Sequence, residues 1–360
     1  MATSELSNRQ FFLIIYSVPL NGHKRYILDF PMKHLEVFKR MDPKDYSLYI
    51  PHDHDHGEPW RFRNLSKAFY LGSYSDIPST IPAIVDRTVY GFYADRGFMS
   101  LNLDIPDAQW ETALPPIAPE RWSPKLISLD NKLYVFGGFA TFSISNVDTE
   151  VKPFGEVFDP QTRKWSPLKP PPECLVICAD RSLFIASLRE FEGKIMVHNP
   201  FTDTIMIYIY DIRTDIWDKY CAPELGFNIL SDDSIFGSAF ATEGDNNLYW
   251  IEKKSALMFA FNWPRNQLYS GAIIGLEDLD TLFDRAVICE GVFLHHLSAD
   301  LFCIIWWSVN GNPYPQTTDI HVTVLRVCMD STTSSLDALV VGCFHDTIEG
   351  DCRIFSALPI

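Results

Sequence analysis

A short pattern that recurs roughly every 50 residues constrains the fold of this chain more than any other feature. The pattern is an apolar residue, Asp, two residues, Thr, two residues and Trp, and it is complete at Phe158–Trp165 and Tyr210–Trp217. In each copy a strand-like run ends at the Asp, the next residues suit a tight turn, and an apolar residue starts the return. The chain therefore repeats one antiparallel unit. Weaker copies begin at Leu28, Leu103, Phe261 and Met329, and the Asp or Asn positions of the six copies are separated by 75, 55, 52, 51 and 68 residues.

The stretch 131–167 shows the unit in most detail. An aromatic strand at Leu133–Phe136 runs into Gly137-Gly138, a long loop follows, and a second strand leads to Asp159. The Gly pair permits close backbone packing, and the Trp six residues past the Asp can return to seal one unit against the next. This stretch resembles one kelch repeat, which has a period of roughly 50 residues and forms one four-stranded blade of a β-propeller. The Gly pair occurs in this copy alone, so the other copies are divergent.

The resemblance implies an all-β fold, and we predict a six-bladed kelch-type β-propeller that occupies residues 1–360 as a single domain. The 24 prolines and 18 glycines punctuate many short strands. One strand is left over at Arg353–Ile360, and the first blade lacks its innermost strand, so we expect the C-terminal strand to close the ring and remove its open edges. The predicted blades are 9–66 with 353–360, 67–122, 123–181, 182–233, 234–291 and 292–352. Lys67–Ser73 is expected to open the second blade, and Pro31–Arg40 suits a short helix.

Charge and composition exclude several classes of protein. A net charge of −16, from 30 Lys and Arg against 46 Asp and Glu, repels nucleic-acid phosphates and anionic lipid. No run approaches the roughly 18 apolar residues of a membrane span, and Met1–Asn8 lacks the basic start and apolar run of a secretory signal. Most of the eight cysteines lie in apolar strands, which favours free thiols in a reducing compartment over disulfides or zinc. We therefore expect a cytoplasmic monomer that binds neither nucleic acid nor membrane.

The propeller topology predicts where a ligand would bind. In four-stranded antiparallel blades, the loops between the second and third strands emerge on the same face as the linkers between blades. Loops on a rigid scaffold usually carry binding, so a ligand is expected on this face, over the central channel. The long loops assigned to it are 36–66, 111–122, 139–154, 166–181, 221–233, 271–291 and 308–319.

Six residues are predicted to contact a ligand there. Tyr70, Lys125, Ser187 and Ser238 fall on the strands expected to be innermost. Trp307 and Tyr314 could form an apolar wall, although Trp306 and Trp307 should face opposite sides of one strand, so that at least one of them packs in the core.

Two groups of histidines are candidates for chemistry. His52, His54 and His56 alternate with Asp, so that their imidazoles lie on one side of an extended segment and could bind a transition metal. His345-Asp346 could complete such a site, and a solvated loop is the alternative. His295 and His296 lie in an innermost strand, where one ring could face the channel as a general acid or base. Structural packing of both rings is the alternative.

These observations support three classes of function. The first is a protein-interaction propeller, which is how kelch proteins most often work, often joined to an F-box or BTB module that this sequence does not show. The second is a small-molecule enzyme or chaperone with an apolar metabolite at the channel mouth, where the enzyme would belong to specialised metabolism and be of isomerase, cyclase or lyase type. The third is a metal-dependent lyase or oxygen-using enzyme built on the His-rich loop. The chain also resembles plant kelch-like proteins without an F-box. It lacks the Glu-x3-Asp-x3-His string of plant specifier proteins, and no cofactor is expected.

Overall fold

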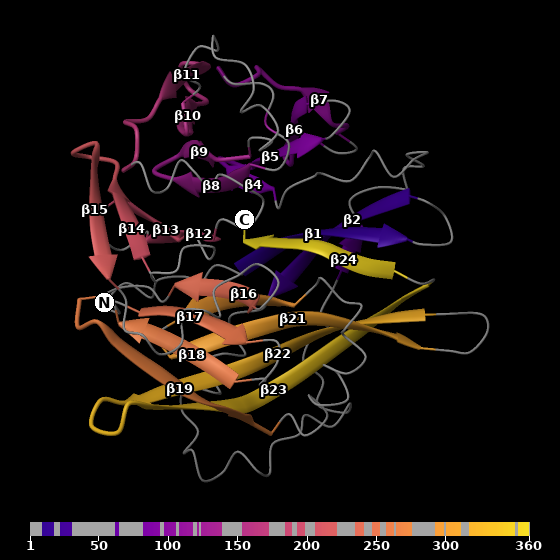
Figure 1. Ribbon diagram of the computed structural model, residues 1–360. Helices are drawn as coiled ribbons and strands as arrows, with labels where there is room; N and C mark the ends of the chain where they lie inside the picture. The colour runs from indigo at the N-terminus through magenta and orange to yellow at the C-terminus, as the bar shows by residue number, and fades with distance from the viewer. Residues whose placement is uncertain are drawn as a thin grey trace, which may run out of the picture.

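The computed structural model describes separate segments of the chain, and all regular secondary structure within these segments is β-strand (Figure 1). No helix in the described part of the chain is long and apolar enough to cross a membrane. The side chains of β1, β2, β3, β12, β16 and β24 are not described. The described ranges are 9–17, 22–30, 62–64, 82–93, 97–105, 108–117, 121, 124–138, 153–172, 184–188, 193–198, 206–221, 235–240, 247–252, 257–262, 264–275, 292–298, 300–310, 317–349 and 352–359.

Four of the five sheets contain four strands each, and all of their neighbouring strands pair antiparallel. The first sheet has the order β24 (Cys352–Pro359), β1 (Arg9–Ser17), β2 (Gly22–Phe30), β3 (Phe62–Asn64). The second has β4 (Ala83–Val85), β5 (Thr88–Tyr93), β6 (Gly97–Asn102), β7 (Glu111–Thr112). The third has β8 (Lys125–Leu129), β9 (Lys132–Phe136), β10 (Gly155–Asp159), β11 (Lys164–Pro167). The fourth has β12 (Phe184–Leu188), β13 (Lys194–His198), β14 (Met206–Asp211), β15 (Ile216–Cys221).

The fifth sheet has eight strands because two antiparallel meanders are joined along their last strands. The first meander is β16 (Ile235–Phe240), β17 (Asn247–Glu252), β18 (Leu257–Asn262) and β19 (Gln267–Ile274). The second is β20 (Phe293–Ser298), β21 (Leu301–Asn310), β22 (Thr317–Asp330) and β23 (Ser335–Glu349). β19 and β23 pair in parallel. This junction was not predicted.

The first strands of the meanders form a ring, in which each lies beside the next in the cyclic order β24, β4, β8, β12, β16, β20. β24 completes the first sheet by pairing with β1, with Leu13 opposite Ala357, as the sequence predicted for the C-terminal strand. The all-β propeller fold is therefore confirmed. Because two meanders share one sheet, the count of six blades, and with it the blade boundaries, stays a prediction.

The repeated pattern forms the same turn in four copies. The Asp or Asn side chain accepts a hydrogen bond from a backbone N–H two or three residues on, as in an Asx-turn. Four residues after it the backbone enters the left-handed region, at Arg163, Asp215, Asn266 and Ser334. In the copy that begins at Leu103 the turn is shifted, because it is the Asn102 Oδ1 that accepts from the backbone N–H of Asp104.

The tryptophan of the pattern packs between neighbouring sheets, as predicted. Trp165 on β11 contacts Phe98 on β6, with ring centroids 5.3 Å apart, and its Nε1 donates to the Leu114 carbonyl at 2.8 Å. Trp217 on β15 contacts Phe136 in the same way, at 6.3 Å, and donates to the Lys169 carbonyl at 3.0 Å. Each tryptophan therefore joins its own sheet to the preceding one through both an apolar contact and a hydrogen bond.

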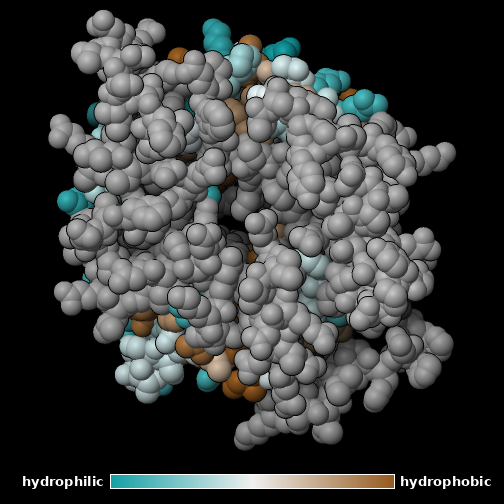
Figure 2. Space-filling view, turned by 45° about the vertical axis from the view of Figure 1, so that its right-hand side comes forward, coloured by the Kyte–Doolittle hydropathy of each residue, from teal (hydrophilic) through white to brown (hydrophobic). Residues whose placement is uncertain are grey.

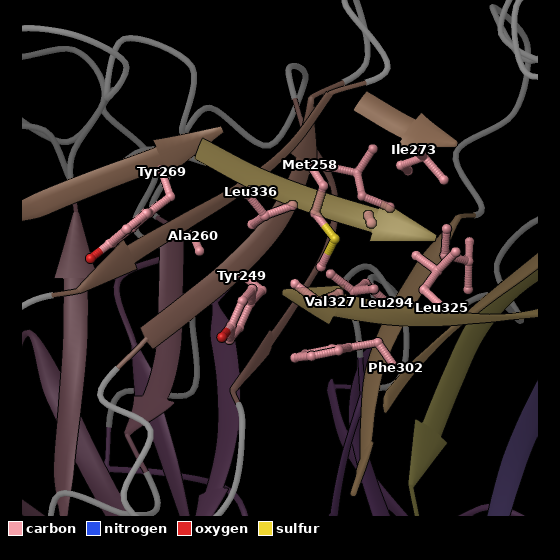
Figure 3. Close-up of a cluster of buried hydrophobic side chains, with 13 residues drawn as sticks. Tyr249, Met258, Ala260, Tyr269, Ile273, Leu294, Phe302, Leu325, Val327 and Leu336 are labelled. Atoms are coloured by element: carbon pink, nitrogen blue, oxygen red, sulfur yellow. The ribbon is translucent and has the colours of Figure 1, made fainter. Parts of the chain in front are cut away.

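The largest described core lies between the two meanders of the eight-stranded sheet (Figure 3). Tyr249 and Met258 from one meander meet Phe302, Val327 and Leu336 from the other. All five side chains are almost fully buried.

Two local expectations need correction. The innermost position of the second sheet is taken by Ala83–Val85, not by Lys67–Ser73, which lies outside the described residues. From the sequence we expect strands at 321–329 and 336–344, but β22 and β23 extend well beyond these bounds, over 14 and 15 residues. The helix suggested at Pro31–Arg40 also lies outside the described residues.

Candidate functional site

The strand directions define the face on which a ligand is expected. β9 leads up to this face at Gly137-Gly138, β10 leads away from it, and the linkers between sheets lie there too. Its described parts are the linker 111–117 with residue 121, the segments 153–154 and 166–172, and the upper ends of β21, β22 and β23.

A buried ion pair holds the linker that precedes β8. The Arg121 and Glu156 side chains are both 0% exposed, and Arg121 Nη2 lies 2.8 Å from Glu156 Oε1. Glu156 Oε2 accepts a hydrogen bond from the Ile117 N–H at 2.6 Å. Burial lowers the pKa of Arg121, and the hydrogen bond and charge of Glu156 oppose that shift.

Arg121 also donates to three backbone carbonyls around the Gly pair. They belong to Gly137, Phe154 and Pro153, the last two at 3.2 and 2.7 Å. These contacts fix the start of the β9–β10 loop and its end to the linker. The arrangement is structural: it supports the loops of this face and leaves neither charge accessible to a ligand.

The upper part of β21, β22 and β23 carries five aromatic and polar side chains that are at least partly exposed, which we call the hairpin patch: Trp306, Asp319, His321, Cys343 and Thr347. The buried Thr323 lies next to them in the same strands. The Trp306 and His321 rings are stacked, with centroids 3.7 Å apart and planes 8° from parallel. Trp306 Nε1 donates to Thr323 Oγ1 at 3.1 Å. The two rings are directly opposite each other in the β21–β22 ladder, so the backbone register imposes the stack.

The rest of the hairpin patch is polar and partly exposed. Thr347 Oγ1 donates to Asp319 Oδ1 at 2.6 Å, two residues along the β22–β23 ladder above the stacked rings. Cys343 Sγ donates to Thr323 Oγ1 at 3.7 Å, two residues along the ladder below the rings. His345 lies opposite His321 in the β22–β23 ladder. An aromatic surface next to a carboxylate and hydroxyl groups suits contacts with apolar and basic side chains of another protein.

The two histidines predicted as acid and base differ in their surroundings. His296 is 7% exposed, and its ring packs against Phe302 with centroids 5.0 Å apart. His295 is half-buried and lies on the other side of β20, as neighbouring strand residues must. The structure thus gives His296 the environment of a core histidine, while the catalytic assignment of the pair stays a prediction.

Two of the predicted ligand contacts are described. Lys125 opens β8 on the inner ring and is half-buried. Trp307 is buried on the face of β21 opposite Trp306, opposite Ile320 in the ladder. Its Nε1 has no hydrogen-bond acceptor among the described residues. Trp307 therefore contributes to packing at this level of the strand, as expected for one of the two tryptophans.

Other predicted site residues cannot be placed from their side chains. Ser187 and Ser238 fall on β12 and β16, which are inner strands as predicted, but their side chains are not described. Tyr70, Tyr314 and the three histidines of the His-rich loop, His52, His54 and His56, lie outside the described residues. Within the described residues, no three His, Cys, Asp or Glu side chains are grouped as metal ligands.

The strand order changes the expected position of the His-rich loop. Residues 31–61 connect β2 and β3, the third and fourth strands of their sheet. Both ends of this segment therefore lie on the face opposite the linkers and the β9–β10 loop. Our assignment of 36–66 to the ligand face is wrong in this respect, because it overlooked the short strand Phe62–Asn64.

Sequence reasoning missed His321, Arg121 and Glu156. His321 falls in the predicted strand 321–329, and only the register with β21 brings it onto Trp306. Arg121 and Glu156 are 35 residues apart and carry no local motif. Of the eight cysteines, the side chains of Cys303, Cys328 and Cys343 are described. These three are free thiols as predicted, although among them only Cys303 is buried.

Comparisons with known proteins agree with the predicted resemblance. Residues 123–172 match the Kelch motif family. A putative F-box/kelch-repeat protein of Arabidopsis thaliana is 28% identical over 169 residues, which cover 47% of this chain and 36% of that protein. A second F-box/kelch-repeat protein of the same plant is 29% identical over 183 residues, 51% of this chain and 40% of the relative. The chain thus spans well under half the length of these relatives.

Two solved structures have a similar outline. The structure of YjhT matches 79% of this chain and 98% of its own, with a TM-score of 0.42 and 13% identity. A chain of the nidogen/laminin complex matches 98% of both chains, with a TM-score of 0.45 and 12% identity.

Proposed function

We propose that this kelch-repeat chain is a cytosolic binding module that recognises a protein partner through the face formed by its linkers and long loops. The kelch motif at 123–172, set in an all-β propeller, is the observation that carries the proposal. Similarity to plant F-box/kelch-repeat proteins supports it, because kelch propellers most often recognise other proteins.

The described geometry fits a binding scaffold. The Arg121–Glu156 pair holds the linker and the β9–β10 loop in place from below. The hairpin patch offers an aromatic stack beside the Asp319 carboxylate. Together with the net charge of −16, this favours a partner that presents basic and apolar side chains. A rigid scaffold with adaptable surface loops is the usual basis of such recognition.

The test is to recover partners with the immobilised wild-type chain and with two variants. His321→Ala removes half of the aromatic stack on the predicted binding face, and Arg213→Ala changes an exposed side chain in the β14–β15 turn on the opposite face. A protein retained by the wild type and by Arg213→Ala but lost from His321→Ala supports the proposal once calorimetry with the purified partner gives the same ranking. Equal binding by all three chains places recognition elsewhere.

The alternative is a small-molecule enzyme of specialised metabolism with an acid and base at the channel mouth. In this alternative the half-buried His295 on the inner strand β20 is a better candidate for the acid or base than His296, whose ring packs against Phe302. Native mass spectrometry after exposure to plant extract, with metal analysis in parallel, tests it. A stoichiometric small molecule or metal that is lost in His295→Gln would replace the binding-module proposal with the enzyme.

A further inference from the structure

The pairing of β19 with β23 is the feature of this fold that the repeat pattern does not explain. Each of these two strands is the last of its meander. In the other described sheets the last strand pairs with the strand before it and with no strand of a neighbouring meander. Here they run parallel, with Ser270 opposite Ser335, Ile273 opposite Ala338 and Ile274 opposite Leu339 (Figure 1). The other last strands, β3, β7, β11 and β15, pair only within their own sheets.

We propose that this β19–β23 ladder is a clasp that makes β16–β23 a single cooperative unit, and that Gly271 is the residue that allows it to form. A Cβ built at position 271 would lie 1.5 Å from the Leu336 carbonyl oxygen and 2.6 Å from its carbon. The obstacle is backbone, which cannot rotate aside as a side chain can. Any other residue at position 271 therefore has to push the two strands apart.

Side-chain contacts hold the lower end of the clasp. Gln267 Nε2 donates to Ser334 Oγ at 2.9 Å and to the Ser331 carbonyl at 3.4 Å, so β19 is tied to the turn that precedes β23. Gln267 Oε1 in turn accepts from the Tyr269 hydroxyl at 2.9 Å. At the upper end the chain leaves the ladder at Gly275, whose φ of +89° suits glycine.

The clasp also covers the largest described core. Tyr269 and Ile273 of β19, and Leu336 and Ala338 of β23, belong to the same buried cluster (Figure 3). Outside this cluster, the Ile274 and Met329 side chains are partly exposed. Figure 2 shows that hydrophobic residues reach the surface in the lower part of the molecule. If the strands separated, both meanders would expose core side chains together. Shared burial of this kind is what makes two elements unfold as one.

The clasp has a consequence for the neighbouring hairpin. β23 continues for ten residues after Leu339, the last residue that pairs with β19, up to Glu349, and this upper part carries the Cys343 and Thr347 side chains of the hairpin patch. Anchoring the lower half of β23 on both sides fixes the base from which the hairpin rises. This inference concerns the fold and stands whether or not the proposed partner binding is correct.

Hydrogen exchange followed by mass spectrometry on the full chain tests the clasp. Gly271→Ala should raise exchange at least about tenfold throughout β19 and in residues 335–340, and leave β8–β15 unchanged. Ser270→Ala is the matched control, because it changes the adjacent exposed residue without adding an atom near Leu336. It should exchange like the wild type.

Two results would overturn the proposal: unchanged exchange in β19 and β23 of Gly271→Ala, or an equal rise in all five sheets. If Gly271→Ala does not fold, the milder Gln267→Ala and the wild type at increasing urea concentrations decide the matter. β19 and β23 should then lose protection at the same urea concentration, and earlier in Gln267→Ala. Loss at different concentrations would show that the meanders open independently.

Discussion

Glu156→Gln tests how the linker before β8 is held. The substitution keeps the shape of the side chain but removes the charge that balances Arg121, and neither side chain is exposed. In the wild type both carboxylate oxygens accept hydrogen bonds, Oε2 from the Ile117 N–H and Oε1 from Arg121. The glutamine has only one oxygen to accept them. An uncompensated buried charge typically costs about 3–5 kcal/mol, so we expect the free energy of unfolding to fall by at least ~3 kcal/mol.

The assay is equilibrium unfolding in urea, followed by tryptophan fluorescence and by circular dichroism. Coincident transitions and an unchanged m-value would show that the change is one of stability. Lys132→Ala is the control on the same sheet, because its Nζ lies 3.9 Å from Asp159 Oδ2 and the pair is partly exposed. Such surface pairs contribute about 0–1 kcal/mol.

A double-mutant cycle with Arg121→Met and Glu156→Leu measures the coupling within the ion pair. Arg121→Met leaves the Glu156 carboxylate buried and removes the donor to the Gly137, Phe154 and Pro153 carbonyls. Combined with Glu156→Leu, the total loss should be smaller than the sum of the single losses by about 2 kcal/mol or more, because each single variant strands one charge. A Glu156→Gln loss no larger than that of Lys132→Ala would refute this reasoning.

Two further predictions concern the packing between sheets and the response to alkaline pH. Trp165→Ala and Trp217→Ala should each lower the free energy of unfolding by about 3–5 kcal/mol in the same urea assay, because each removes a large ring from between two sheets together with its indole hydrogen bond; little loss from either would mean that the repeat has been assigned in the wrong register. Burial raises the pKa of Tyr134 to about 12, above the ordinary value of 10.0, so its contribution to stability is complete below pH 10 and is lost as the pH rises towards 12. In urea titrations at a series of pH values, the free energy of unfolding of Tyr134→Phe should therefore fall by about 2 kcal/mol less than that of the wild type between pH 10 and 12. Equal falls in the two proteins would contradict the raised pKa of Tyr134.

Much of the fold could be predicted from sequence because its information is local. A turn that needs Asp at its start and a left-handed residue four positions later leaves the same signature each time, as at Asp159 and Asp211. Some strand bounds could be predicted as well: the alternating pattern places a strand at Lys194–His198, which are the bounds of β13, whereas β22 and β23 extend beyond their predicted ends. The closing strand could be inferred by counting, since one strand was left over and one was missing.

The candidate site was less predictable because it depends on register and on distant partners. Nothing near His321 in the sequence shows that Trp306 will lie against it, since that contact needs the β21–β22 alignment. The position of the His-rich loop depended on a three-residue strand, Phe62–Asn64, too short to carry a period-two pattern. Lys125, Ser187 and Ser238 do fall on inner strands, and their assignment to a common ligand site stays a prediction.

The sequence by itself determined the repeated four-stranded unit, its turns, its sealing tryptophans and the strand that closes the ring, because each depends on residues within one repeat or on their count. Only the tertiary structure decided that Arg121 and Glu156 would meet, that Trp306 would stack on His321, and that β19 would join β23. Gly271 illustrates the difference: in the sequence it is one glycine among 18, and its necessity comes from the Leu336 carbonyl, 65 residues away along the chain and 1.5 Å from where a Cβ would be.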